Sequence, residues 1–383
     1  MSDLVIKNVY YFDGREFRYG NVTVGAGVFQ AVGSKGAENG AQVIDGQGKR
    51  LVPGFIDIHT HGAAGVDVNA ATADELGRIA AFFASQGTTA WHCSVLTDTP
   101  EQTLWCISQA KELMGRTGYG AELMGVHLEG PFLSSEYKGA MPEHLLRKGD
   151  AALFEEYQKA AEGAIKYITV SPEVQNVNEM IGRISGNVVV AIGHSGAEYE
   201  AAMEAIEKGA RCITHTFNAM KLFHQHRPAI MGAALESDAW CEAICDGLHL
   251  HPAAVRLLLK CKGWDRVVAV SDSIMATGLP DGKYKLGVND VVVENGDAKL
   301  ASTGVRAGST LTSIRALRNL MSFTGAPMEK VLPLLTTNPA EAMRIDDRKG
   351  KLLPDYDADC VLLDEEMNVA LTVVKGEVVY KAQ

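Results

Sequence analysis

Eight short apolar segments recur along the chain between residues 53 and 344. Their length and their turn-rich boundaries predict β-strands. Amphipathic runs such as TADELGRIAAFFASQG and AEYEAAMEAIEKGA lie between most of them and predict helices. Eight strands alternating with helices over this length predict an α/β fold, a (β/α)8 TIM-like barrel, with a doubly wound sheet as the alternative. The eight segments are GFIDIHTH, TTAWHCSVLT, LMGVHLEGPF, KYITVSPE, NVVVAIGHS, RCITHTFNA, CEAICDGLHL and RVVAVSDSI.

The two ends of the chain, residues 1–52 and 345–383, differ from the middle. Both alternate apolar and polar residues between Gly, Asn and Asp turns, which is typical of strands and turns. Chain ends often lie close together. We therefore expect both ends to form one small β-sandwich domain beside a (β/α)8 barrel of residues 53–344.

Charge and apolar content exclude several partners. The 383 residues carry a net charge of -11, which argues against a nucleic-acid surface because such a surface needs a basic face. No apolar run approaches a membrane span, and the start MSDLVIKNVYYFDG has no signal-peptide pattern. The seven cysteines lack zinc-finger spacing, and Cys241 and Cys245 are expected to be buried thiols in a reducing cytoplasm.

Histidines and carboxylates recur at the carboxyl ends of the predicted strands, where barrel enzymes keep their chemistry. His59 and His61 are two apart on a strand, so their side chains point to the same face. The alternative for this pair alone is two packed histidines in a loop. Imidazole and carboxylate together suit zinc, iron or manganese, so the whole set predicts a divalent-metal centre. Its other members are Glu129, His194, His215, His249 and Asp272.

Three further polar residues near this set are expected to have supporting roles. Asp57 lies on the same face as His59 but deeper, and we expect a core or supporting partner. His127 shares a face with Glu129, so it either orients a ligand or is a hydrogen-bonded core histidine. His92 is expected to be structural.

The chain contains the motifs PGFIDIHTHG, GVHLEGPF, GHSGA, THTFNAM, GAAL, DGLHLHP, VSDS and AGSTLT. Together they resemble the N-acetylglucosamine-6-phosphate deacetylases of the amidohydrolase superfamily. The His-x-His pair is shared by many amidohydrolases, whereas HLEGPF combined with THTFNAM is specific. The likeness runs from Pro53 to GKLLPDYDADCVLLD and so covers nearly the whole chain.

The resemblance implies a metal-ligand set. Glu129, His194 and His215 match the core metal site of the family. His59 and His61 match the pair found in members that hold a second metal, with Glu129 as the bridge. One or two divalent metals per chain are therefore implied, zinc first, with iron or manganese accepting the same ligands.

The resemblance also implies a catalytic residue and a substrate site. Asp272 matches the catalytic aspartate. Asn218, Ala219, Arg227 and His249 match positions that hold the sugar phosphate, so the implied partner is a phosphorylated N-acetyl amino sugar. It further suggests a homodimer in which Arg227 reaches the site of the neighbouring subunit.

The chain departs from the family in the segment KGAMPEH. Many relatives carry a histidine there that helps to polarise the acetyl carbonyl, and this chain has Met141 instead. His144, three residues further on, is the candidate to replace it. The departure concerns the carbonyl contact and leaves the implied reaction unchanged.

The implied reaction is deacetylation of N-acetylglucosamine 6-phosphate to glucosamine 6-phosphate and acetate. A divalent metal lowers the pKa of water, and Asp272 can take its proton and pass it to the departing amine. One alternative is an amidohydrolase for a different N-acyl sugar or for a cyclic amide. Ring-opening relatives usually bridge two metals with a modified lysine, and KYITVSPE has no lysine at its carboxyl end. Another alternative is a barrel that has no catalytic activity and serves as a scaffold. Such a protein should have lost Asp272 or a metal ligand, and this chain retains them all.

Overall fold

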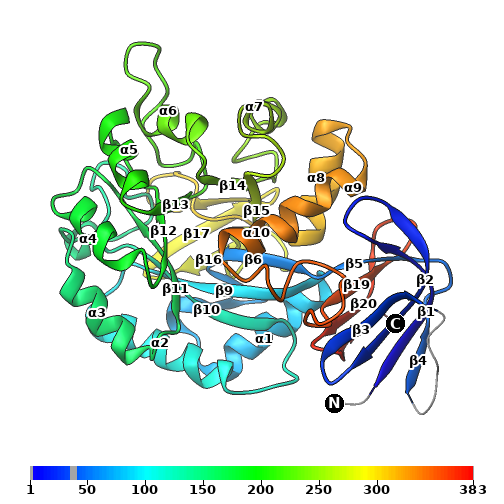
Figure 1. Cartoon of the computed structure of the whole chain (residues 1–383). Helices are drawn as coiled ribbons and strands as arrows, with labels where there is room; N and C mark the ends of the chain where they lie inside the picture. Colours follow the sequence, from blue (N-terminus) through cyan, green and yellow to red (C-terminus); the bar gives the residue numbers. More distant parts are fainter. Residues whose placement is uncertain (1–2, 35–40, 383) are drawn as a thin grey trace.

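The computed structural model describes residues 3–34 and 41–382 and shows a barrel beside a smaller sheet domain (Figure 1). Eight neighbouring parallel strands form the barrel in the order β6, β9, β10, β11, β12, β13, β14 and β15. The sheet nearly closes, because the Asp272 amide donates to the His59 carbonyl at 2.9 Å and Thr60 bridges Ser273. The prediction of a (β/α)8 barrel is confirmed, and the doubly wound alternative is wrong. The barrel strands are Phe55–Thr60 (β6), Thr88–Leu96 (β9), Glu122–Glu129 (β10), Ile165–Val170 (β11), Val189–Ile192 (β12), Ala210–Ile213 (β13), Trp240–Ile244 (β14) and Val267–Val270 (β15).

The helices cover the outside of the barrel, and their ends carry capping residues. Helix α1 starts after Thr72, whose hydroxyl accepts from the Glu75 amide while the Glu75 carboxylate accepts from the Thr72 amide. Its apolar face, including Leu76 and Ile79, is buried against the barrel. The helices are Ala73–Ser85 (α1), Pro100–Met114 (α2), Ala151–Ala160 (α3), Val177–Ile184 (α4), Tyr199–Glu207 (α5), Ala229–Glu236 (α6), Pro252–Lys262 (α7), Ser313–Thr324 (α8), Met328–Val331 (α9) and Thr337–Ala342 (α10), with short 3-10 turns at Val68–Ala70 (η1), Glu143–Leu145 (η2) and Leu332–Leu335 (η3).

Both chain ends build the smaller domain. Its strands form one connected sheet in the order β21, β20, β19, β5, β1, β2 and β3, with β4 also paired to β1. The sheet packs around its own apolar core, which includes Leu4, Phe29 and Leu371. Strand β5 runs almost directly into β6 and so joins this domain to the barrel. The strands are Leu4–Phe12 (β1), Phe17–Gly25 (β2), Val28–Ser34 (β3), Gln42–Asp45 (β4), Arg50–Pro53 (β5), Cys360–Leu363 (β19), Val369–Val374 (β20) and Glu377–Lys381 (β21).

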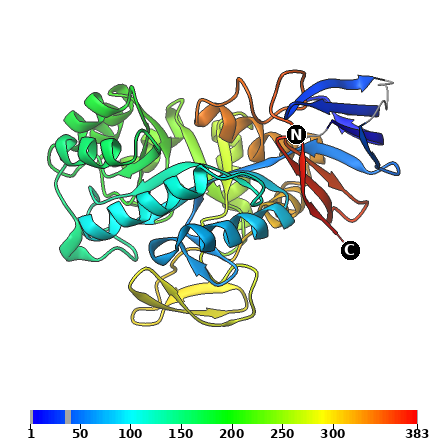
Figure 2. The same ribbon diagram turned by 90° about the horizontal axis from the view of Figure 1, so that it is seen from below.

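A three-stranded antiparallel sheet lies between β15 and α8 in the chain, and the sequence did not lead us to expect it. It consists of Gly282–Leu286 (β16), Asn289–Glu294 (β17) and Asp297–Leu300 (β18). Figure 2 shows it projecting from the barrel, apart from the smaller domain. Its apolar face packs on Leu96 at the end of β9 and on Leu133 and Met141 from the barrel loops. A short hairpin, Gly62–Ala63 (β7) with Val66–Asp67 (β8), follows β6.

Two smaller expectations concern membranes and cysteines. Among the described helices, none is both long and apolar enough to cross a membrane. Cys241 and Cys245 are buried free thiols, as predicted.

Candidate metal centre and active site

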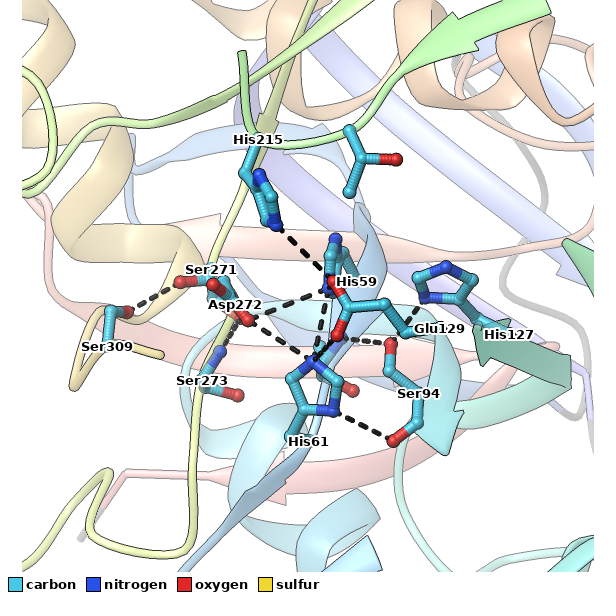
Figure 3. A network of polar contacts seen from close by, with 12 residues as sticks. His59, His61, Ser94, His127, Glu129, His215, Ser271, Asp272, Ser273 and Ser309 are labelled. Atoms are coloured by element: carbon cyan, nitrogen blue, oxygen red, sulfur yellow. Dashed lines mark hydrogen bonds and ion pairs between the residues drawn. The ribbon is translucent and has the colours of Figure 1, made fainter. Parts of the chain in front are cut away.

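The polar residues predicted from the strand ends lie together around one cavity, and Figure 3 shows five of them, His59, His61, Glu129, His215 and Asp272. His59 is on β6 and His61 directly follows that strand, while Glu129 is the last residue of β10. The remaining members, His194, His215 and Asp272, each lie two residues beyond the ends of β12, β13 and β15. A cavity of about 620 Å³ opens over them. Parallel strands end at the same face of a barrel, and this brings residues from five strands to one place.

His59 and His61 face each other through their Nε2 atoms, which are 3.1 Å apart. Glu129 lies beside both: its Oε1 is 3.4 Å from His59 Nε2, and its Oε2 is 3.2 Å from His61 Nε2. All three side chains are buried. They make the first half of the centre.

The second half shares the same carboxylate. The Nε2 atoms of His194 and His215 are 3.0 Å apart, and Glu129 Oε1 lies 3.1 Å and 3.3 Å from them. Burial alone would raise the pKa of Glu129, but His194 and His59 outweigh it and hold that pKa well below its ordinary range. Glu129 is therefore an ionised group between two pairs of imidazoles.

The hydrogen bonds of the imidazoles indicate that this cluster is suited to a metal. The Nδ1 atoms of His61 and His194 lie 3.0 Å and 2.8 Å from the carbonyl oxygens of Ser94 and Tyr137. A carbonyl only accepts, so each Nδ1 carries a proton, and the ring in its neutral form presents a lone pair at Nε2 toward Glu129. Lone pairs at such short separations repel each other unless a cation lies between them. The donor set thus fits a divalent metal in each half.

Asp272 lies beside the first half. Its Oδ1 is 3.3 Å from His61 Nε2 and 3.6 Å from His59 Nε2. The backbone of Asp272 is left-handed, with φ of 50°, and the same holds for His194 at 47° and His215 at 27°. Such conformations are strained for residues other than glycine and persist only where surrounding contacts enforce them. Here they turn the side chains from the strand ends into the cavity.

Asp57 and His127 are buried next to the ligands. Asp57 accepts hydrogen bonds from the His59 and Ser271 amides, both at 3.3 Å, and burial raises the pKa of Asp57 to about 6. His127 contacts the hydroxyls of Ser94 and Thr169, which corresponds to the core alternative. Neither belongs to the groups of atoms that could hold a metal.

Sequence reasoning missed Glu242. It lies in the middle of β14, is 1% exposed, and its Oε2 is 3.0 Å from His59 Nδ1. Burial would raise the pKa of Glu242, but His59 and several hydrogen bonds outweigh it, so the pKa is lowered. The search at strand ends could not find a residue at mid-strand. A charged residue within the apolar run WCEAI was the available signal.

Asn218, Ala219 and His249, three of the residues that the resemblance assigned to the sugar phosphate, line another part of the same cavity. The Nδ1 atom of His249 lies 2.6 Å from Asp246 Oδ2, which orients the ring. Lys138 and Arg306, which were not singled out from the sequence, also line the cavity.

Three other residues bear on the substrate site. Arg227 ends a run of exposed residues, 222–227, and is not among the described residues that line the cavity. His144 is exposed on η2 and is likewise absent from the described lining, so the structure lends no support to its carbonyl contact. Met141 lines the cavity and packs against the β16–β18 sheet.

Comparison with known proteins agrees with this geometry. The model of the amidohydrolase family matches residues 50–379. An N-acetylglucosamine-6-phosphate deacetylase of Bacillus subtilis is 34% identical over 86% of this chain and 84% of its own length. An N-acetylgalactosamine-6-phosphate deacetylase of Escherichia coli O157:H7 is 32% identical over 85% of this chain and 87% of its own length. A mutant deacetylase from Mycobacterium smegmatis, solved in complex with N-acetyl-D-glucosamine-6-phosphate, superposes with a TM-score of 0.91 at 31% identity and covers 100% of both chains.

Proposed function

Because the chain belongs to the amidohydrolase family, whose members are metal-dependent, we propose that it deacetylates N-acetylglucosamine 6-phosphate to glucosamine 6-phosphate and acetate. It is a hydrolase acting on an amide bond. The observation that carries the proposal is the position of Asp272, whose carboxylate lies 3.3 Å from an Nε2 atom of the ligand cluster, at the floor of the cavity. A proton-accepting group is therefore close to the place where a metal and an acyl group would meet.

The residues divide the chemistry between them. Glu129, His194 and His215 would hold one divalent metal, and His59 and His61 would hold a second that shares Glu129. A metal bound there lowers the pKa of water and polarises an amide carbonyl. We assign zinc first, with iron or manganese as alternatives, because the same nitrogen and oxygen ligands accept all three.

Asp272 acts first as base and then as acid. Its carboxylate takes a proton from the attacking water, and the same oxygen then donates that proton to the sugar nitrogen as the amide bond breaks. The amine leaves in neutral form for this reason. Backbone contacts hold Asp272 in place, since its amide donates to His59 and its carbonyl accepts from Ser309 at 2.7 Å.

The phosphate would lie against the part of the cavity that Asn218, Ala219 and His249 line. Arg227 is exposed on its own subunit, so we propose a homodimer in which this residue reaches the cavity of the neighbouring subunit. Guanidinium groups bind phosphate through paired hydrogen bonds. The buried free thiols suit a reducing cytoplasm, where we place the protein.

Acetate release tests the proposal. We expect efficient turnover of N-acetylglucosamine 6-phosphate, weaker turnover of the sugar without phosphate, and none of dihydrouracil, a cyclic amide. The N-acetylgalactosamine 6-phosphate arm tests the alternative raised by the Escherichia coli relative. Preference for that sugar would redirect the assignment, and equal kcat/KM for N-acetylglucosamine with and without phosphate would contradict it.

A substitution of Arg227 tests the phosphate contact separately. Arg227→Ala should narrow the gap in kcat/KM between the two N-acetylglucosamine substrates, because only the phosphorylated one uses the guanidinium. Arg78→Ala is the matched control, since Arg78 is an exposed arginine on α1 that pairs with Glu75 at 3.8 Å. The control should leave the gap unchanged.

A further inference from the structure

Glu242 is a buried charge whose hydrogen bonds all go to the surroundings of the metal centre. Its Oε2 lies 3.0 Å from His59 Nδ1 and accepts from the His215 amide at 2.9 Å. Its Oε1 accepts from the Tyr167 hydroxyl at 2.7 Å. Glu242, His59 and Tyr167 are each at most 1% exposed. Burying a carboxylate costs several kcal/mol unless partners compensate, and the rest of β14 is apolar.

His59 differs from the other imidazoles in the partner of its Nδ1 atom. The corresponding partners of His61 and His194 are neutral carbonyl oxygens, and His215 Nδ1 has no hydrogen-bond partner among the described residues. Of the four imidazoles around Glu129, His59 is the one whose Nδ1 atom faces a carboxylate. A carboxylate on the far nitrogen fixes the tautomer and the ring orientation and makes the near nitrogen a stronger ligand.

We infer that Glu242 is a positioning residue of the metal centre: its carboxylate holds His59 with Nε2 toward Glu129 and so determines whether the His59–His61 half binds a cation. The inference rests on the proposed function only for what the bound metal does, namely catalysis. The His59–His61 half, like the His194–His215 half, has two imidazoles and the shared carboxylate. With so few donors, the strength of each imidazole ligand bears directly on whether a half binds a cation.

The contact with the His215 backbone makes Glu242 a link between the two halves. His215 has φ of 27°, and its amide donates to the same Oε2 atom that faces His59. Glu129 contacts the Nε2 atoms of both halves. Glu242 instead contacts the Nδ1 atom of His59 in one half and the backbone amide of His215 in the other. In Glu242→Gln a side-chain oxygen can still accept from the His215 amide, so this variant should remove the charge and spare that backbone contact.

A zinc-binding cycle tests the inference. Metal-free wild type, Glu242→Gln, His59→Asn and the double variant are equilibrated with zinc and a competing chelator, and zinc per chain is measured by elemental analysis. We expect about two zinc ions in the wild type and a loss of roughly 10–100-fold in affinity for one of them in Glu242→Gln. In the His59→Asn background, Glu242→Gln should change zinc affinity by less than about twofold, because a residue that acts through His59 has no further effect once His59 is gone.

Tyr167→Phe is the matched control. It removes a hydrogen bond from the other oxygen of Glu242 without touching His59, and it should retain both zinc ions. Wild-type zinc content in Glu242→Gln would overturn the inference. So would a single zinc in the wild type, an equal effect of Glu242→Gln with and without His59, or the same zinc loss in Tyr167→Phe.

Two further measurements separate the possible failures. Thermal melts of the metal-free variants show whether each one folds. If Glu242→Gln does not fold, Glu242→Asp takes its place in the cycle, because it keeps the carboxylate but shortens its reach toward His59. Acetate release by the zinc-loaded wild type is measured independently. If the zinc-loaded wild type releases no acetate, the proposed function is contradicted and the zinc-binding result still stands. If Glu242→Gln binds zinc as the wild type does, only the role of Glu242 is contradicted.

Discussion

At the scale of single residues, Asp272 is the group on which the proposed chemistry depends most. Asp272→Asn keeps the shape of the side chain but removes its ability to accept a proton. We expect kcat for N-acetylglucosamine 6-phosphate to fall by at least about 10²–10⁴-fold, the usual contribution of general acid–base catalysis. Zinc content and the melting temperature should stay close to wild type, because Asp272 is not one of the five proposed ligands.

The control for this residue is Asp290→Asn in the β16–β18 sheet. Asp290 is an exposed carboxylate that pairs with Lys285 at 2.7 Å, outside the metal cluster. It should retain full activity. Turnover of Asp272→Asn within a few-fold of wild type would contradict the role of Asp272 as base and acid.

At the scale of elements, strand β9 carries a histidine that should make stability depend on pH. His92 is 2% exposed, and its Nδ1 has no hydrogen-bond partner among the described residues. Burial, aided by the charge of Lys166, lowers the pKa of His92 from 6.5 to about 3. The folded chain therefore keeps this imidazole neutral, whereas the unfolded chain protonates it below about pH 6.5.

The sign follows from this difference in proton binding. Stability from neutral His92 is complete above pH 6.5 and declines as the pH falls toward 3, because the unfolded state then binds the additional proton. Between pH 7 and pH 5 the decline should be about 2 kcal/mol. Urea unfolding of wild type and His92→Gln at both pH values measures it. The variant should lose less stability over this interval, and an equal loss in both proteins would contradict the prediction.

At the scale of the whole molecule, Lys349 joins the smaller domain to the barrel. Its ammonium lies 2.8 Å from Glu122 at the start of β10, 2.8 Å from Asp357 and 2.6 Å from Asp359 next to β19. The side chain is fully buried. Burial alone would lower the pKa of Lys349, but the three carboxylates hold it above its ordinary value. One cation thus balances acidic groups from both parts of the fold.

Removal of that cation should destabilise the folded chain. Lys349→Met removes a partner from all three carboxylates and leaves the buried Asp359 without an ion pair among the described residues, so we expect the free energy of unfolding to drop by about 3–5 kcal/mol. The matched control is Lys375→Met, whose ammonium pairs with the same Glu122 at 2.6 Å but whose side chain is 38% exposed. Exposed pairs contribute about 1 kcal/mol or less. Equal effects of the two changes in denaturant unfolding would contradict the central role of Lys349.

Local pattern determined the elements of this protein. Apolar runs of strand length and amphipathic runs of helix length arise from the 2- and 3.6-residue periods of the backbone, which can be detected in a single sequence. All eight predicted barrel strands are present, and α1 and α5 lie within the quoted helical runs. Because parallel strands of a barrel end at one face, the polar residues at their ends could be grouped before any contact was known.

Tertiary structure decided the contacts between elements that are distant in sequence. Glu242 and His59 are 183 residues apart in the sequence. Their contact depends on which strands lie near β6 once the barrel closes. The β17–β18 hairpin did carry a local signal, the Asn295–Gly296 turn, which was not recognised, whereas the exposed position of Arg227 had none. The sequence by itself thus determined which polar groups lie at the ends of the barrel strands, since local periods place side chains on faces. Only the three-dimensional arrangement decided which buried residues, such as Glu242, hydrogen-bond to these groups. Such contacts depend on strand order and barrel closure, which no local pattern specifies.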